Sequence, residues 1–368
     1  MRLLIKIMLR LLIENIYPSK FRFVGTLMIV ELKDVCEKEI SNIRQKDLLD
    51  KKGDYPIYGA SGLIGNVDFY RQETPYVAVV KDGAGIGRAM LLPAKSSVIG
   101  TMQYLIPKGN VLPEYLYYVV KNMHLEKYYS GATIPHIYFK YYKKEKFNLV
   151  DLDQQRKIIS VFKKIEDAIR KQRDELTNLD TLIKARFVEM FGDPICNSKN
   201  KSTTKFINVV KLQRGFDLPI RKRNTQGKIP VYGSNGVLGY HDEFKASSGI
   251  ITGRSGTIGK VYYENNEFWP LNTALFSVKT YGNNIIYLKY LVSLFKLERF
   301  CNGAGVPTLN RNDVHKQKII DIPIKEQNKF ASFVQQVDKS KVVNASIMKY
   351  IISIRFYLYF KENKEGAR

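Results

Sequence analysis

The sequence is poor in the residues that build metal sites and disulfide scaffolds. Its 368 residues include three cysteines, four histidines and one tryptophan. The cysteines are odd in number and form no Cys-x-x-Cys pair, and the histidines lie far apart: Cys36, Cys196 and Cys301, and His124, His136, His241 and His315. This pattern argues against a disulfide-stapled domain and a zinc site. We therefore expect no metal and no cofactor, and a reducing cytoplasm fits best.

The sequence also lacks an apolar run long enough to cross a membrane. The most apolar segment, "LLIKIMLRLLI" at 3–13, is interrupted by Lys6 and Arg10, whereas a spanning helix needs about 20 apolar residues. No Ala-x-Ala cleavage site follows, as a signal peptide would require. We expect no membrane association, and we interpret residues 3–16 as a helix within an N-terminal extension, 1–30, that packs on another part of the protein.

Acidic residues are in deficit. There are 59 lysines and arginines against 35 aspartates and glutamates, a formal net charge of +24. An excess of this size favours a polyanionic partner, nucleic acid first and an anionic membrane surface second. A solvated basic surface without a partner is the alternative.

An aromatic, glycine-rich phrase occurs twice. "YPIYGASGLIGNVDFY" at 55–70 matches "IPVYGSNGVLGYHDEF" at 229–244, and the correspondence continues along the chain. Lys81 matches Arg254, Gly131 matches Gly303, and the offset drifts only from 174 to 172 residues. A colinear series of this length indicates a duplicated domain with small changes in its loops.

Each half contains the same predicted elements in the same order. A YG loop is followed by a strand, a glycine turn ("KDGAGIGR", "RSGTIGK"), a second strand, an aromatic helix and a Gly-Pro loop ("SGATIPHI", "NGAGVPTL"). A period of 172 residues far exceeds the 20 to 50 of solenoid repeats. The sequence therefore predicts two whole domains of mixed α/β (α+β) structure, at 31–150 and 196–323.

A long amphipathic helix is predicted after each domain, at 151–195 and 324–368. The first helix would be about 55 Å long at 1.5 Å per residue. Its apolar positions step by four and three, and we assign to the seams Phe162, Ile165, Ile169, Gln172 and Leu176 in the first helix and Val334, Val337, Asn344 and Ile351 in the second. We expect the two helices to pair as an antiparallel coiled coil, the alternative being that each packs on its own domain.

The glycine turns do not match a nucleotide-binding motif. "GAGIGR" is neither G-x-G-x-x-G nor a P-loop, and "GTIGK" is one residue shorter. Backbone N–H groups of such a turn, with Lys81 and Arg88 or with Arg254 and Lys260 beside them, can meet a DNA phosphate. The alternative is a plain hairpin turn with solvated basic residues.

No set of catalytic residues recurs in both halves. The tetrapeptide Asn/Asp-Pro-Pro-aromatic of adenine methyltransferases is absent, and the nuclease-like triplet Glu243-Phe244-Lys245 loses its lysine in the other half. The chain therefore has the pattern of a binding protein rather than an enzyme. Tyr58 and Tyr232 are candidate contacts on predicted loops, whereas four tyrosines at helical spacing favour a core position: Tyr117, Tyr118, Tyr128 and Tyr129.

From residue 31 to about 362 the sequence resembles the specificity subunits of type I restriction-modification systems. The resemblance is carried by the YG loops, the loops "GATIPHI" and "GAGVPTL", and the segments "LVDLDQQRKIISVF" and "IIDIPIKEQNKFASFV" that lead into the long helices. It implies two target-recognition domains that each read half of a bipartite DNA site, held apart by the helices. It also implies two methyltransferase subunits and a motor nuclease subunit as partners. A methylation-only system, a fused nuclease-methyltransferase partner, or a duplicated structural adaptor without DNA binding are the alternatives.

Two similar readers on a spacer should recognise two different half-sites roughly 10 base pairs apart, centre to centre. The shared phrase would present the same surface to the duplex, and its altered polar tips would read different bases. We therefore assign base contacts to four side chains: Ser61, Asn66, Ser234 and Asn235.

Overall fold

The computed structural model describes residues 28–364, apart from 49–51, 132–133, 225 and 304, with side chains described as far as residue 353. The expected helix at 3–16 lies outside the described residues. The chain divides into two compact units, unit 1 (Met1–Gln172 with Ile347–Arg368) and unit 2 (Arg173–Ser346). The boundary between the units therefore falls within both long helices.

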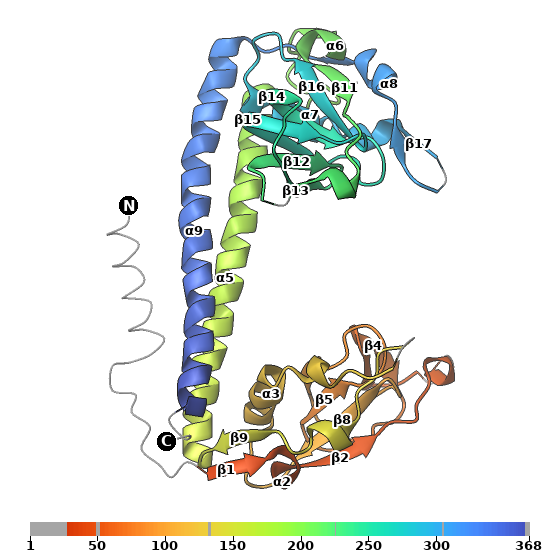
Figure 1. Ribbon diagram of the computed structural model, residues 1–368, viewed down its shortest axis with the longest axis vertical. Coiled ribbons are helices and arrows are strands. Elements are labelled where there is room, and N and C mark those ends of the chain that lie inside the picture. The colour runs from red at the N-terminus through yellow and green to blue at the C-terminus, as the bar shows by residue number, and fades with distance from the viewer. Residues whose placement is uncertain (1–27, 49–51, 132–133, 225, 304, 365–368) are drawn as a thin grey trace. The chain divides into compact units, whose positions relative to one another are not determined.

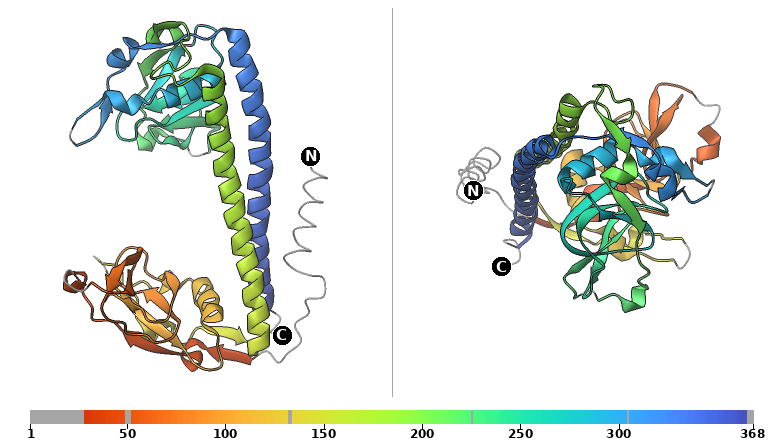
Figure 2. Two further views of the ribbon diagram at one scale, coloured as in Figure 1. Left: turned by 180° about the vertical axis from the view of Figure 1, so that it is seen from behind. Right: turned by 90° about the horizontal axis from the view of Figure 1, so that it is seen from above.

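Unit 1 is built on a four-stranded antiparallel sheet with the order β2-β8-β5-β6 (Figures 1 and 2). Its central strand reads YVAVV and is buried along its whole length, because helix α3 packs on one face and residues of β3 and β7 pack on the other. The elements of unit 1 are β1 (Met28–Glu31), α2 (Leu32–Val35), β2 (Cys36–Ile40), η1 (Gln45–Leu48), β3 (Tyr55–Gly59), β4 (Gly62–Val67), β5 (Tyr76–Val80), β6 (Ala89–Leu92), β7 (Ser97–Val98), β8 (Met102–Pro107), α3 (Pro113–Asn122), η2 (Leu125–Tyr128), α4 (Phe139–Tyr142) and β9 (Lys146–Leu149).

Strand β1 pairs with β9, so that residues 28–30, assigned by sequence to the N-terminal extension, lie in a strand of unit 1. A second, three-stranded sheet has the order β4-β3-β7, in which β3 and β7 are parallel. The hairpin of β3 and β4 is the first copy of the repeated phrase.

Unit 2 repeats this plan in one six-stranded sheet with the order β11-β16-β14-β15-β12-β13. Unit 2 has one sheet where unit 1 has two, because β15 is a single ten-residue strand that takes the places of both β6 and β7. The end of β15 pairs in parallel with β12, as β7 pairs with β3 in unit 1. The elements are β10 (Thr203–Lys205), α6 (Phe206–Val209), β11 (Lys211–Arg214), η3 (Ile220–Lys222), β12 (Ile229–Gly233), β13 (Gly236–His241), β14 (Ala246–Gly253), β15 (Val261–Pro270), β16 (Ala274–Lys279), α7 (Ile285–Leu294), η4 (Leu297–Phe300), β17 (Cys301–Asn302), β18 (Thr308–Leu309), α8 (Arg311–His315) and β19 (Lys318–Ile320).

A buried glutamine ties the start of each long helix to its unit. In unit 1, Gln155 Oε1 accepts the backbone N–H of Leu112 at 2.8 Å just before α3, and its Nε2 donates to two backbone carbonyls. In unit 2, Gln327 Oε1 accepts the N–H of Asn284 at 2.9 Å just before α7. Both glutamines are at most 1% exposed, so the repeat preserves a buried polar connection.

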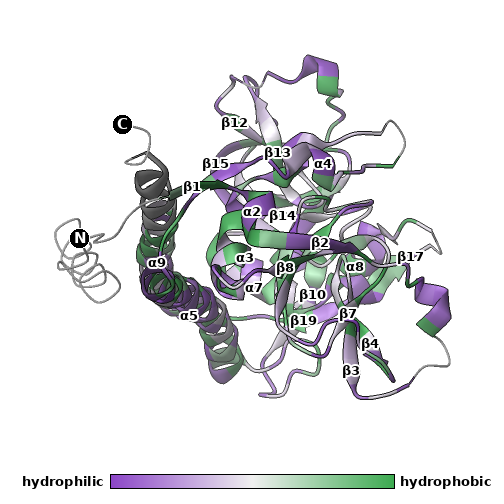
Figure 3. Ribbon diagram, turned by 90° about the horizontal axis from the view of Figure 1, so that it is seen from below, coloured by the Kyte–Doolittle hydropathy of each residue, from purple (hydrophilic) through white to green (hydrophobic). Residues whose placement is uncertain are grey.

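The long helices are α5 (Leu152–Phe191) and α9 (Ile324–Lys364), and Figure 3 shows hydrophobic and hydrophilic residues alternating along α5. In unit 2 their segments lie side by side and run antiparallel, since Asp180 bonds Lys341 whereas Phe187, further along α5, contacts Phe330, earlier in α9. The helices also pack on their own domains: Phe162 stacks on Tyr118 of α3 in unit 1, at 4.7 Å between ring centroids. Both sequence-based packing alternatives therefore occur together.

Most of the seam residues assigned from the sequence are buried. Phe162, Ile165, Ile169, Val334, Val337 and Ile351 are at most 7% exposed, and Gln172, Leu176 and Asn344 are half-buried. The polar seam residues Gln172 and Asn344 therefore lie where the seam is less buried.

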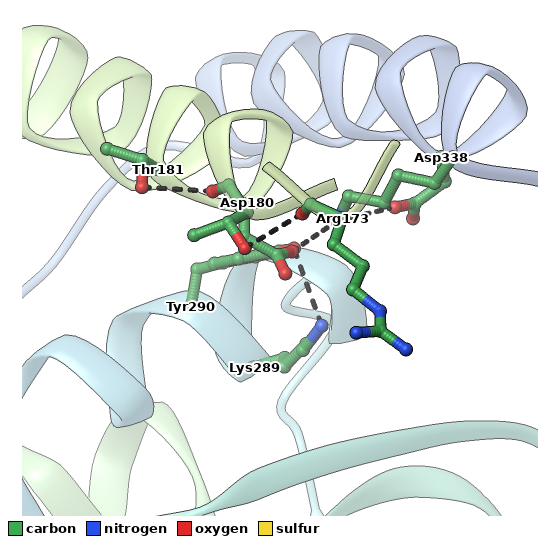
Figure 4. A network of polar contacts seen from close by, with 8 residues as sticks. Arg173, Asp180, Thr181, Lys289, Tyr290 and Asp338 are labelled. Atoms are coloured by element: carbon green, nitrogen blue, oxygen red, sulfur yellow. Dashed lines mark hydrogen bonds and ion pairs between the residues drawn. The ribbon is translucent and has the colours of Figure 1, made fainter. Parts of the chain in front are cut away.

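A polar network connects α5, α9 and α7 within unit 2 (Figure 4). Lys341 Nζ lies 2.6 Å from Asp180 and 3.2 Å from Asp338. Burial alone would lower the pKa of Lys341, but these two carboxylates raise it overall. Burial lowers the pKa of Lys289, whose Nζ lies 3.4 Å from the Tyr290 hydroxyl. Lys341 therefore joins α5 to α9 within unit 2, and the carboxylates of Asp338 and Asp180 act electrostatically on Lys289 of α7.

Two details of the sequence-based prediction were wrong. The segments 113–129 and 285–300, each predicted as one aromatic helix, each form a helix followed by a separate 3-10 turn. The helix is interrupted because His124 and Lys296, which precede the 3-10 turns, adopt left-handed conformations. Tyr129, expected in the core, is 53% exposed, whereas Tyr118 is buried. Tyr117 and Tyr128 are half-buried.

Candidate nucleic-acid interface

Backbone hydrogen bonds join three segments into one surface in unit 1: the β3–β4 hairpin turn, the glycine turn 82–88 and the Gly-Pro loop that ends at Ile137. Gly83 N–H donates to Pro135 O at 2.9 Å, and Ile137 N–H donates to Lys81 O at 2.9 Å. Arg88 Nη1 donates to Ala60 O at 3.1 Å and so connects the glycine turn to the hairpin. We call these three segments the loop surface of unit 1.

Unit 2 carries the matching loop surface, formed by the β12–β13 turn, the glycine turn 254–260 and the Gly-Pro loop that ends at Leu309. Gly256 N–H donates to Pro307 O at 3.1 Å, and Leu309 N–H donates to Arg254 O at 2.8 Å. Each bond is the counterpart of one in unit 1, at the offset read from the sequence. The repeat therefore preserves a backbone geometry as well as a succession of elements.

Both glycine turns are hairpin turns, as the plainer sequence interpretation has it. In unit 1, Gly87 N–H donates to Val80 O at 2.9 Å, which closes the hairpin of β5 and β6. In unit 2 the corresponding turn connects β14 and β15. Both turns therefore connect paired antiparallel strands, and the assigned basic residues lie at the ends of these turns.

The two basic residues ahead of the turns have different surroundings. Lys81 forms an ion pair with Asp82, whose carboxylate also contacts His136 Nδ1 on the Gly-Pro loop. At the same place in unit 2, Arg254 is followed by Ser255, and its Nη1 donates to Asn272 O at 3.2 Å. Among the described residues no carboxylate forms an ion pair with Arg254, so its positive charge is less compensated than that of Lys81.

The remaining cations lie at the edge of the surfaces. Arg88 and Lys260 are both exposed. Lys260 Nζ donates to Asn235 Oδ1 at 2.8 Å and so bridges the glycine turn and the hairpin of unit 2. The structure therefore brings together Lys260, Asn235 and Arg254 in one surface, and Lys81, Arg88 and the hairpin turn in the other.

The assigned polar tips are accessible. Ser61, Asn66 and Asn235 are exposed, and Ser234 is half-buried. Asn66 lies on strand β4 opposite Pro56 rather than in the turn. Three of the four side chains can therefore reach a ligand without rearrangement.

The two tyrosines assigned as contacts lie on strands rather than loops. Tyr58 is in β3 and packs against the core of unit 1. Tyr232 is in β12, is 7% exposed, and its hydroxyl donates to Glu264 at 3.1 Å. Burial and the Glu264 carboxylate raise the pKa of Tyr232 to about 12. These packed positions favour a structural role for both tyrosines. Each Tyr-Gly pair forms the end of a strand, Tyr58-Gly59 in β3 and Tyr232-Gly233 in β12.

Sequence reasoning missed several residues of the loop surfaces. Asp82 and His136 were not singled out, and neither were Ile134 and Val306 at the Gly-Pro loops, which are 65% and 64% exposed. Alignment of the two halves could have identified Ile134 and Val306, because it pairs one with the other directly.

Most groups on the two surfaces are of kinds that bind nucleic acid. The surfaces include lysines, arginines, hydroxyls, amides and backbone N–H groups, which contact phosphates and base edges, together with the Asp82–His136 pair of unit 1. In the part of the chain that the structure describes, no group of three or more His, Cys, Asp or Glu residues is placed to hold a metal ion. No helix among the described residues is long and apolar enough to span a membrane.

Comparison with known families agrees with this geometry. The family model of the type I restriction modification DNA specificity domain matches the chain twice, at residues 25–178 and 198–349. The chain belongs to the family of type I restriction-modification specificity subunits. Each match covers one loop surface together with most of one long helix, so the duplicated unit of this specificity subunit is a domain plus its helix.

Matches to known proteins extend over nearly the whole length of both chains. A protein of Haemophilus influenzae assigned as a type I restriction enzyme specificity subunit is 23% identical over 372 residues, 88% of this chain and 91% of its own. The crystal structure of the S subunit from M. genitalium matches with a TM-score of 0.57 at 14% identity, covering 94% of this chain and 98% of that one. A chain from a study of complex assembly in the type I R-M system matches with a TM-score of 0.56 at 12% identity, covering 93% and 98%. At these identities the likeness establishes the fold.

Proposed function

We propose that this specificity subunit recognises a bipartite DNA sequence and directs adenine methylation and restriction by partner subunits. The observation that carries the proposal is the duplicated loop surface, whose backbone bonds match while its polar tips differ. One surface would read each half-site, the recognition domains being residues 31–150 and 196–323. The basic residues would hold phosphates, and the hairpin tips would contact base edges.

The subunit would contribute recognition and no catalysis. Methyl transfer would come from two methyltransferase subunits, and DNA translocation and cleavage from motor nuclease subunits. The helices α5 and α9 are suited to dock these partners, since they expose apolar side chains that their own domains leave uncovered: Leu182, Val188, Val342 and Tyr350, exposed by 38% to 63%.

The decisive experiment maps modified adenines across the genome of the source cell, with and without this gene. We expect a motif of two defined halves and a fixed unspecified gap to lose its methylation on deletion. Restoring the gene on a plasmid should restore the same motif. Unchanged methylation in cells that express the neighbouring methyltransferase gene would contradict the proposal.

A structural adaptor without DNA binding is the competing function from another class. The two are separated by the salt dependence of duplex binding, because phosphate contacts release counterions and affinity must then fall steeply with salt. An adaptor would show no duplex binding at any salt concentration. A methylation-only system differs from a restricting one in its neighbouring genes, which either include or lack the motor nuclease.

A further inference from the structure

The described part of the Gly-Pro loop in each unit exposes one large aliphatic side chain. Ile134 and Val306 each precede the proline of their Gly-Pro loop and are 65% and 64% exposed. Aliphatic side chains of this kind are stabilised when a contact removes them from water. The same exposure at the same position in both units indicates a shared binding role.

Backbone hydrogen bonds anchor the proline that follows each of these side chains. Gly131 and Gly303 have positive φ angles of 101° and 108°. A Cβ on Gly131 would lie 2.6 Å from Ile134 O, and a Cβ on Gly303 would lie 3.1 Å from Val306 O. The hydrogen bonds that Pro135 O and Pro307 O accept from the glycine turns complete the restraint. The residue after each aliphatic side chain is therefore tied to the glycine turn of its own unit.

The neighbouring groups select the kind of partner. The glycine turn bonded to the residue after Ile134 carries Lys81 and Arg88, and the turn bonded to the residue after Val306 carries Arg254 and Lys260. An apolar side chain on a loop that is bonded to a cation-bearing turn matches a ligand with anionic edges and an apolar interior. Duplex DNA has this composition, with phosphates outside and stacked bases inside.

The type of residue at each position separates two kinds of contact. The hairpin tips differ in their polar groups, as expected of side chains that read different bases. Ile134 and Val306 keep the same aliphatic, β-branched character in both units, which fits a contact that does not depend on the base. Apolar side chains that enter a groove and part a base step make such a contact, and they bend the duplex.

We propose that Ile134 and Val306 act as matched apolar wedges, one for each half-site, each inserting against a base step while the adjacent cations hold the flanking phosphates. This inference rests on the proposed DNA-reading function. It adds that the subunit deforms its target at two places, and that part of its affinity comes from DNA flexibility rather than from base contacts.

The test uses the full chain, alone and with its methyltransferase partners, and a duplex carrying the motif found by methylation mapping. Ile134→Ala and Val306→Ala are compared with Ile40→Ala and Val278→Ala, which truncate exposed aliphatic residues elsewhere on the same units. Binding is measured by titration, bending by energy transfer between dyes at the duplex ends, and unstacking by 2-aminopurine fluorescence. We expect each wedge variant to bind roughly tenfold more weakly and to lose the bend at its own half-site, with the controls unchanged.

The outcomes separate the wedge from the function beneath it. Wild-type binding with no effect of either wedge variant would overturn the wedge alone. Weaker binding with unchanged bending and fluorescence would also overturn it, because the contact would then be an ordinary one. Loss of methyltransferase association with normal duplex binding would assign these side chains to a partner interface instead. Failure of the wild-type complex to bind the duplex would remove the proposed function itself.

Discussion

The two loop surfaces have the same backbone and different charge distributions. In unit 1, Lys81, Asp82 and His136 form a chain of charged contacts. In unit 2 the corresponding positions are Arg254, Ser255 and Thr308. Both units keep the backbone bridge, Asp82 with His136 and Ser255 with Thr308, but only unit 1 adds an ionic contact between the two side chains. The comparison teaches that duplication preserved how the loops are connected, while the charge presented to a ligand was free to diverge. Unit 2 should therefore anchor phosphates more strongly than unit 1.

The largest expected effect is on stability, and it tests the buried glutamine that both units share. Replacing Gln155 or Gln327 by Leu leaves a buried N–H and buried carbonyls without partners, and each variant should lose about 2–4 kcal/mol of unfolding free energy. Denaturant titration of the full chain measures the loss, and the exposed Gln336→Leu on the same helix as Gln327 serves as control. If one glutamine variant lost unfolding free energy and the other did not, the two glutamines would not have the same structural role in the two units.

The next effect tests the difference in charge. Arg254→Ala should weaken duplex binding roughly tenfold and reduce the slope of log affinity against log salt by about 1. Lys81→Ala should do less, because Asp82 already offsets the lysine charge. Arg254→Lys keeps the charge and should keep the slope, which is read from titrations at several salt concentrations. Equal losses for the two alanine variants would contradict the assigned asymmetry.

A reciprocal exchange should reverse the comparison. Asp82→Ser frees the charge of Lys81 and should raise duplex affinity by about threefold, whereas Ser255→Asp places a carboxylate beside Arg254 and should lower it by about threefold. The same titrations measure both variants. If Asp82→Ser and Ser255→Asp shifted duplex affinity in the same direction, the difference in charge would not explain the difference between the two units.

The smallest effect concerns acid pH and unit 2 only. His315 Nε2 accepts the backbone N–H of Leu212 at 3.0 Å, and burial, with Arg311 and Lys211, lowers the pKa of His315 below its ordinary 6.5. Above pH 6.5 the imidazole is neutral in both folded and unfolded chains. As the pH falls below 6.5 the unfolded chain takes up the proton first, so the unfolding free energy should decrease.

The counterpart of His315 in unit 1 is Lys143, which offers no such acceptor. His315→Gln keeps an acceptor that does not titrate, and it should make the unfolding free energy flatter between about pH 7 and pH 5. Denaturant titrations of the wild type and this variant across that range supply the check. An unaltered pH profile in His315→Gln would assign the acid sensitivity to other groups.

Much of the fold could be predicted because its signals lie along the chain. The heptad spacing of Phe162, Ile165 and Ile169 reports a helix directly, and the colinear repeat reports a second domain without knowledge of the first. The break at His124 escaped prediction, because a left-handed residue in an apolar, aromatic segment leaves the helical periodicity almost intact. Tyr232 escaped for another reason: its burial depends on β15 and Glu264, which lie some 30 residues away in the sequence.

The sequence by itself determined the duplicated plan, the order of elements, the two long helices and the excess of positive charge, since each follows from spacing, repetition or counting. The tertiary structure alone decided which polar groups face outward, which lysine is paired with a carboxylate, and that Ile134 and Val306 stay exposed on loops bonded to the glycine turns. Those properties depend on partners brought together through space, such as Asp82 with His136 and Gly256 with Pro307. Neither periodicity nor composition records these contacts, because folding creates them.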